Sequence, residues 1–218
     1  MTRTARLTVV LLLNLALVAG LVVAGISAHS VGVLAAGGDY LADAAAIGVS
    51  LLAITLARRP PSRRHPGGYP RATAYAALLN VTLLLAVVIL VVTEAARRLI
   101  AGTGQVHGLA VLIASGIAAV AMLAGGLILR GDGEAEDDTE GDRANMRAVV
   151  LDTLADSAAA AGVAITGAII LAAPALAWLD PTIALVIAAV ISYHALPLIR
   201  DVVRTLRQQH LHPPSAAQ

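Results

Sequence analysis

Apolar residues occur in long runs separated by short polar segments. Six of these runs are close to the roughly 20 residues that an α-helix needs to cross a bilayer. The first follows two arginines, and its apolar core exceeds the 7 to 15 residues typical of a secretion signal, so we interpret it as a retained span. The pattern predicts an all-α integral membrane protein with six transmembrane helices, at about 7–27, 33–57, 73–96, 106–129, 147–172 and 176–199.

Composition supports this membrane interpretation. Of the 218 residues, 58% are hydrophobic and only 13% are charged, which is unusually apolar for a soluble domain. The chain has no cysteine, which excludes disulfides and thiolate metal sites. A formal net charge of +1 gives no indication of a nucleic-acid partner.

Arginine placement predicts the orientation of the six spans. All 15 basic residues are arginine, and in the six-span arrangement only Arg97 and Arg98 lie on the outer side. The positive-inside bias therefore predicts cytoplasmic N- and C-termini. Lysine-free, alanine-rich usage is typical of a GC-rich bacterial genome, so we expect a multi-pass protein of the bacterial cytoplasmic (inner) membrane.

The charged segments between and after the spans complete the domain plan. Residues 1–205 form the transmembrane domain, 131–143 an acidic cytoplasmic loop, and 206–218 a short disordered tail. The acidic loop contains seven of the 14 acidic residues. A solvated spacer is the favoured interpretation of this loop, although it could also attract cations toward the membrane.

Four aspartates lie inside predicted spans, where a charge is costly. Asp39 and Asp43 occur in GDYLADAAA, and Asp152 and Asp156 in the similar LDTLADSAAA. Residues four apart share one helical face, so each pair points both carboxylates in one direction. If the second and fifth spans face each other, four carboxylates converge near the middle of the membrane.

Such a cluster needs positive partners, because ionisable groups within a membrane pair with one another or face a cavity. The sequence places every arginine at a span end or in a loop, which leaves protons or a metal cation to neutralise the carboxylates. A cation that binds would displace protons. The pattern therefore favours a site that exchanges a divalent cation for protons, exposed alternately to each side.

Several motifs around these pairs resemble the cation diffusion facilitators, a family of six-span metal/proton antiporters. DYLAD and DTLAD match the family's paired ligands on its second and fifth helices. The segment HSVGVLAAGGDYLAD, the loop HPGGYPR, the run from NVTLLL to EAARRL, the segment NMRAVVLDTLAD and the pair Asp180-Pro181 occur in the family's order. The resemblance extends from about residue 8 to residue 205.

The resemblance implies a metal cation efflux transporter rather than an enzyme. Its metal ligands would be Asp39, Asp43, Asp152 and Asp156, and the divalent cation would be cargo, so no resident cofactor is expected. His65, Asn80 and Glu94 match family positions and are accessory candidates. Family members usually continue into a cytoplasmic domain that helps them dimerise. Only about 19 residues follow residue 199, too few for such a domain, so we expect any homodimer to form through the membrane helices.

The four ligands also bear on which metal moves. Relatives selective for zinc typically have a histidine in one of the two pairs, whereas here all four ligands are aspartate. Carboxylates suit Mn²⁺, and imidazole favours Zn²⁺. We therefore expect Mn²⁺ or Fe²⁺ ahead of Zn²⁺.

Two other functional classes would also place aspartates inside a membrane. An intramembrane aspartyl protease needs only two aspartates that share a proton, and a scaffold would use its polar residues only to join helices. The i, i+4 spacing of four aspartates favours a cation site over both. Outside the spans, His29 could contact departing cations, whereas we expect an interfacial position for His107 at the start of the fourth span.

Overall fold

A computed structural model of the chain describes residues 3–57, 72–102, 104–130 and 140–211, and these residues form six long α-helices and one short 3-10 helix. Each predicted span falls on one of the long helices. The helices are α1 (Arg3–Ala28), α2 (Val31–Ala57), α3 (Ala72–Ala101), α4 (Gly108–Arg130), α5 (Glu140–Ala172) and α6 (Leu179–Leu211), and the 3-10 helix η1 (Pro174–Leu176) connects α5 to α6.

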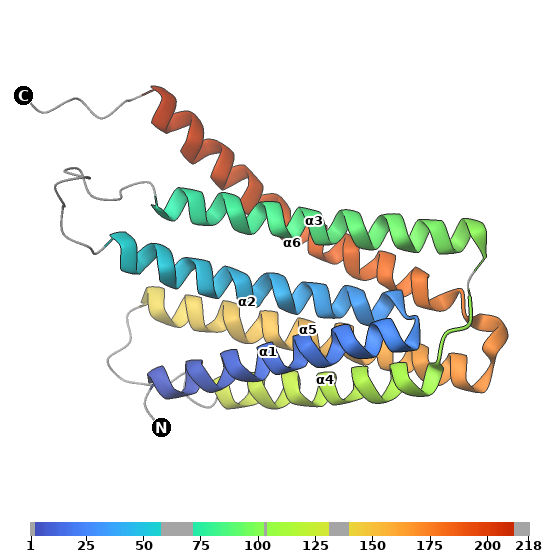
Figure 1. The fold of residues 1–218 in the computed structure, drawn as a ribbon. Helices are drawn as coiled ribbons and strands as arrows, with labels where there is room; N and C mark the ends of the chain where they lie inside the picture. The colour runs from blue at the N-terminus through green and yellow to red at the C-terminus, as the bar shows by residue number, and fades with distance from the viewer. Residues whose placement is uncertain (1–2, 58–71, 103, 131–139, 212–218) are drawn as a thin grey trace, which may run out of the picture.

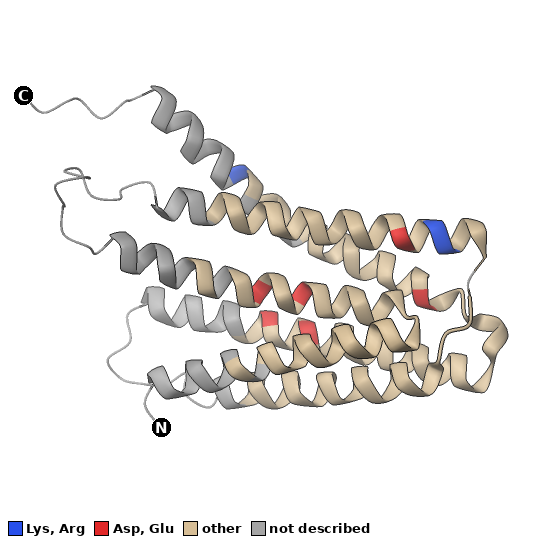
Figure 2. Ribbon diagram, viewed as in Figure 1, with Lys and Arg blue, Asp and Glu red and all other residues tan. Residues whose placement is uncertain are grey.

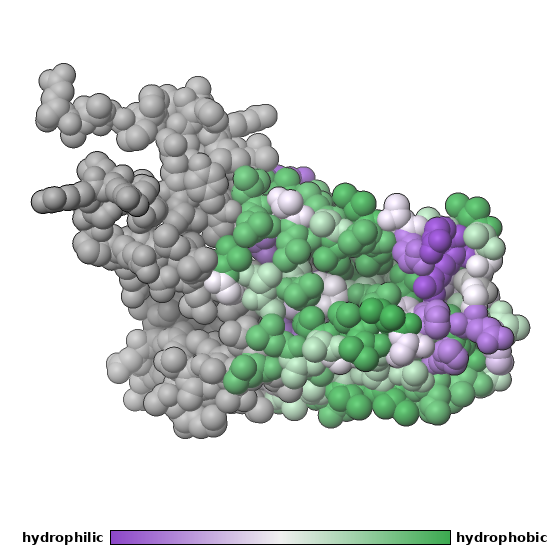
Figure 3. All heavy atoms as spheres, viewed as in Figure 1, coloured by the Kyte–Doolittle hydropathy of each residue, from purple (hydrophilic) through white to green (hydrophobic). Residues whose placement is uncertain are grey.

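The described flank of the bundle is apolar, as a membrane protein requires. Within the described residues, four helical segments are long and apolar enough to cross a membrane: Ala77–Ala101, Gly108–Leu127, Val150–Ala172 and Pro174–Pro197. A shorter apolar segment, Asn14–Ala28, belongs to α1. Figure 3 shows hydrophobic side chains along the described flank and hydrophilic ones gathered at one end. The protein is therefore an all-α membrane protein, and the count of six spans stays a prediction.

The helices run alternately up and down, so that α2 and α5 are antiparallel (Figure 1). α4 packs along α5, whereas α2 contacts α1, α3, α5 and α6. α1 begins and α6 ends at the same end of the bundle, and the α1–α2 and α5–α6 connections lie at the opposite end (Figure 1). We call this opposite end the connection end. The arrangement places α2 beside α5, the two helices that carry the aspartate pairs.

Two glycines allow α4 and α5 to approach backbone to backbone. A Cβ atom added at Gly167 would lie 2.6 Å from the Leu112 nitrogen and 2.9 Å from the Gly108 carbonyl oxygen. A Cβ atom added at Gly108 would lie 2.7 Å from the Gly167 oxygen. Backbone atoms cannot move aside as a flexible side chain can, so only glycine fits at both positions. Small residues at contacts between membrane helices permit such close packing.

A buried carboxylate joins the start of α6 to the start of α2. Asp180 is fully buried, and its Oδ1 accepts a 2.5 Å hydrogen bond from the Ser30 hydroxyl. The backbone N–H groups of Val31 and Gly32 donate to Asp180 at 2.7 Å and 3.2 Å. Ser30 is itself the N-cap of α2, because its hydroxyl accepts from Val33 N–H at 3.1 Å. We call this group the Asp180 clasp. It satisfies the orphan donors of α2 and places a carboxylate at the positive end of that helix.

Two predicted boundaries differ from the structure. α6 continues to Leu211, so residues 206–211 are helical, and the expected disordered tail does not begin at 206. The segment DVVRTLRQQHL contains no glycine or proline, and a search for apolar runs misses a polar continuation of a helix. α5 begins at Glu140, so the last part of the predicted 131–143 loop is helical, whereas the rest of that loop and residues 212–218 lie outside the described residues.

The close packing of α4 on α5 predicts that alanine lowers the free energy of unfolding at Gly167 but not at Gly116. Gly167→Ala should lower the free energy of unfolding by about 1–3 kcal/mol, because its methyl group overpacks against the α4 backbone. Gly116→Ala on α4 is the matched control, since nothing lies within 4 Å of its added Cβ. Thermal unfolding of the purified protein in detergent measures both variants. Equal unfolding midpoints would contradict the close backbone packing.

Candidate metal site

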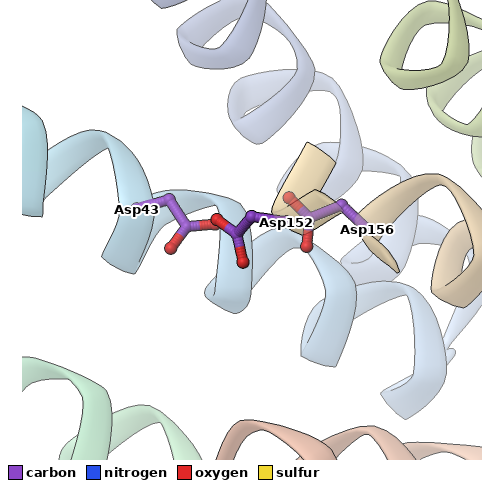
Figure 4. Close-up of side chains that lie close together, drawn as sticks. All are labelled: Asp43, Asp152 and Asp156. Atoms are coloured by element: carbon purple, nitrogen blue, oxygen red, sulfur yellow. The ribbon is translucent and has the colours of Figure 1, made fainter. Parts of the chain in front are cut away.

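Three aspartates bring their carboxylates together between α2 and α5, with Asp43 and Asp156 half-buried and Asp152 exposed. One oxygen each from Asp43, Asp152 and Asp156 lies within 4.8 Å of the others. Asp43 comes from α2, and Asp152 and Asp156 come from one face of α5 (Figure 4). Their spacing is close enough for the three oxygens to bind one cation after small side-chain movements. The predicted convergence of the second and fifth helices is therefore present for these three.

Asp39 belongs to the same cavity but not to this trio. All four aspartates line a cavity of about 410 Å³ between α2, α3, α5 and α6. Figure 2 shows the acidic residues of α2 and α5 at one level of the bundle. Asp39 is half-buried and close enough to repel Asp43 and Asp152 electrostatically. It therefore adds a fourth carboxyl group to the cavity wall, outside the trio.

The rest of the cavity wall is apolar. Its other described residues are alanine, glycine, leucine, isoleucine and valine, and no described lining residue is basic. The wall includes Leu84 of α3 and five residues of α6, namely Ile183, Val186, Ile187, Val190 and Ile191. In such surroundings, nearby carboxylates repel one another more strongly than they would in water. This arrangement suits a site that is occupied by a cation or by protons.

Tyr40 fixes the two acidic helices against each other. Its side chain is only 1% exposed, and its hydroxyl donates a 3.1 Å hydrogen bond to the backbone carbonyl of Asp156. The Tyr40 carbonyl in turn accepts from the Asn14 amide on α1 at 3.4 Å. α5 is held from its other side by Ser157, whose hydroxyl donates to the Ala119 carbonyl on α4 at 2.9 Å. Residues adjacent in sequence to the aspartates thus set the separation of the carboxylates.

The three accessory candidates have different positions. Glu94 is bound by two arginines near the connection end of α3, with contacts of 2.8 Å to Arg98 and 2.9 Å to Arg97. Asn80 lies on α3 one turn before Leu84, and its buried Oδ1 atom has no hydrogen-bond partner among the described residues. His65 lies outside the described residues. The structure therefore separates Glu94 from the cavity and places Asn80 near it.

Sequence reasoning missed the positions of Tyr40 and Asp180. Tyr40 stands inside the DYLAD motif and is one of only five aromatic residues, which is the signal that could have drawn attention to it. For Asp180 the sequence offers only its place in the Asp180-Pro181 motif. Its burial against α2 depends on a contact between residues 150 positions apart, which no local pattern reveals.

The fold and the site together define a class of protein. It is a multi-pass helical membrane protein with carboxylates gathered between two of its helices. Comparison with known proteins places it more narrowly. Residues 7–207 match the family described as Cation efflux transmembrane domain. The chain therefore belongs to the cation diffusion facilitator family of cation efflux proteins, which confirms the resemblance found in its motifs.

Several curated relatives have similar sequences. The Zinc transporter ZitB of Escherichia coli (strain K12) is 31% identical over 185 residues, which is 85% of this chain and 56% of that protein. The Proton-coupled zinc antiporter SLC30A2 of Homo sapiens is 29% identical over 193 residues, covering 87% of this chain and 52% of that protein. The chain thus spans about half the length of these relatives.

The carboxylate cluster predicts stabilisation by a divalent cation. Mn²⁺ at about 100 times its Kd should raise the free energy of unfolding by about 2–3 kcal/mol, because only the folded protein brings the carboxylates together. Thermal unfolding with and without the cation measures this gain. Asp43→Asn and Asp156→Asn should abolish it. Glu94→Gln, which removes an acid outside the cavity, should retain it, and equal losses in all three variants would place the cation elsewhere.

Proposed function

We propose that this protein exports a divalent transition-metal cation of the Mn²⁺, Fe²⁺ and Zn²⁺ class in exchange for protons. In this proposal Asp39, Asp43, Asp152 and Asp156 form the cargo site, which opens alternately to each side of the membrane. The observation that carries the proposal is the convergence of three carboxylates within 4.8 Å, from antiparallel helices, on an apolar cavity. Family membership is independent support.

Electrostatics supplies the coupling between cation and protons. Asp43 lies 12 residues from the start of α2, about 18 Å along the helix axis, so its charge is far from either end of α2. Carboxylates crowded there are neutralised either by protons or by a cation. A cation that binds must displace the protons, and its departure allows them to return. An inward proton gradient can thereby drive outward movement of the metal.

The relatives and the ligand set bear differently on the cargo. The printed names of the relatives above specify zinc, and one of them specifies coupling to protons. The all-carboxylate ligand set favours harder cations such as Mn²⁺ over Zn²⁺. We therefore include zinc in the cargo class and expect a relative preference for Mn²⁺ or Fe²⁺.

The membrane and the orientation are also part of this proposal. Relatives from Escherichia coli and Yersinia pseudotuberculosis support a bacterial cytoplasmic membrane. The distribution of arginine supports cytoplasmic termini, which would place the connection end outside. A homodimer through the membrane helices stays a prediction.

Transport can be measured with purified protein in vesicles that contain a metal-sensitive dye. An imposed pH gradient should drive uptake of Mn²⁺, Fe²⁺ or Zn²⁺, and Asp43→Ala and Asp156→Ala should reduce the rate to that of protein-free vesicles. Tyr193→Phe, a change at an exposed position outside the cavity wall, is the matched control and should transport normally.

The alternatives give other results in the same preparation. Cleavage of a peptide without dependence on the gradient would support an intramembrane protease. Absence of flux with Mn²⁺, Fe²⁺, Zn²⁺, Co²⁺ and Cd²⁺ would support a helical scaffold that does not transport cations. Flux that persists in both aspartate variants would mean that the cation travels by a different path.

Ligand exchange tests how selectivity arises. Asp152→His should raise the ratio of Zn²⁺ to Mn²⁺ transport, and a ligand preference of about 1.4 kcal/mol would change that ratio tenfold. Asp39→His should have a smaller effect, because Asp39 lies outside the close trio. Initial rates with each metal measure the ratio. A ratio unchanged in both variants would show that ligand type does not determine selectivity.

A further inference from the structure

Two histidines distant in sequence lie together at the connection end of the bundle. His29 occupies the turn between α1 and α2, and His107 immediately precedes α4. Both side chains are exposed, and their ring centroids are 5.9 Å apart with planes inclined by 55°. The surface at this end is hydrophilic (Figure 3), and the cavity wall contains neither histidine.

Backbone hydrogen bonds hold both histidines in place. The backbone N–H of His107 donates to the Ala28 carbonyl at 3.1 Å, which ties the segment before α4 to the end of α1. Arg98 donates a hydrogen bond from its guanidinium to the His29 carbonyl. These contacts come from three separate parts of the chain, and they hold the backbones of the two histidines close together.

His29 also has an unusual backbone conformation. Its φ of 55° lies in the left-handed region, and it is the only non-glycine residue with positive φ in the described part of the chain. This conformation costs about 1–2 kcal/mol for a residue with a Cβ, and glycine would avoid most of that cost. An outlier of this kind points to a functional role for the side chain.

The separation of the rings fits two imidazoles on one metal ion. With nitrogen ligands at about 2.0–2.1 Å from Zn²⁺, the centres of two bound imidazole rings lie roughly 5–6 Å apart. We propose that His29 and His107 form a second, solvent-facing metal site, with one nitrogen from each ring and water in the remaining positions. Two imidazoles select Zn²⁺, Co²⁺, Ni²⁺ or Cu²⁺ rather than Mn²⁺ or Mg²⁺.

The surrounding charges permit a cation at this place. Arg98 contacts the His29 carbonyl, but its guanidinium is paired with Glu94 at 2.8 Å and also interacts electrostatically with Asp180. Glu94 binds the neighbouring Arg97 as well. These contacts partly neutralise both arginines. The ligand class separates the two sites, since the cavity offers oxygen and the surface pair offers nitrogen.

Chemical modification tests the proposal, because the modification rate of each histidine can be measured separately. The protein is the Asp43→Asn, Asp156→Asn double variant of the full chain, so metal at the cavity cannot contribute. Diethyl pyrocarbonate modifies free imidazole, and digestion with mass spectrometry gives the rate at each histidine. With Zn²⁺ at about ten times its Kd, the rates at His29 and His107 should both fall about tenfold.

Single substitutions test whether the two rings bind one ion. His107→Gln should remove the protection of His29, and His29→Gln that of His107, because one imidazole alone binds weakly. Ser27→Ala is the matched control, since the Ser27 hydroxyl bonds only within its own helix in the described structure, and both histidines should remain protected. Unfolding midpoints measured without metal establish that each variant is folded.

Two results would overturn the proposal. One is an unchanged modification rate at His29 and His107 in the presence of Zn²⁺, and the other is protection of His29 that survives His107→Gln. Neither depends on transport, because the double variant lacks the carboxylates that the proposed transport requires. Failure of the transport experiment would in turn not contradict the histidine site, because the modification experiment does not measure transport.

Discussion

Electrostatic repulsion among carboxylates in an apolar interior is the constraint that organises this protein. Asp43, Asp152 and Asp156 lie within 4.8 Å of one another, with Asp39 in the same cavity. Water would weaken their repulsion, but much of the wall around them is aliphatic. A positive species in the cavity would offset this repulsion. In the proposed function, that species is a metal cation or protons.

The contacts around the cavity fit this constraint, because they fix the separation of α2 and α5. Tyr40 bonds to the backbone beside Asp156, so α2 reaches α5 at the level of the carboxylates. α5 is supported from behind by α4 through the backbone contact at Gly108 and Gly167. Hydrogen bonds and close packing therefore oppose the charges that would otherwise push the two helices apart.

The sequence predicted the helices and the acidic pairs because both depend on local patterns. Long apolar runs identify helices, and aspartates four apart must share a helical face. The tail from 206 was predicted less well, because a polar helical extension leaves no apolar signal. The unequal position of Asp39 also escaped prediction, since it depends on the relative rotation of two helices. The contact between His29 and His107 depends on the path of two connections, which local patterns do not specify.

The Asp180 clasp limits how the bundle can move. It binds α6 to the first turn of α2 through three hydrogen bonds to one fully buried carboxylate. Separating these helices at the connection end would leave that carboxylate buried without its donors, which is costly. Any separation of α2 from α6 would therefore be smallest where Ser30 and Asp180 join them.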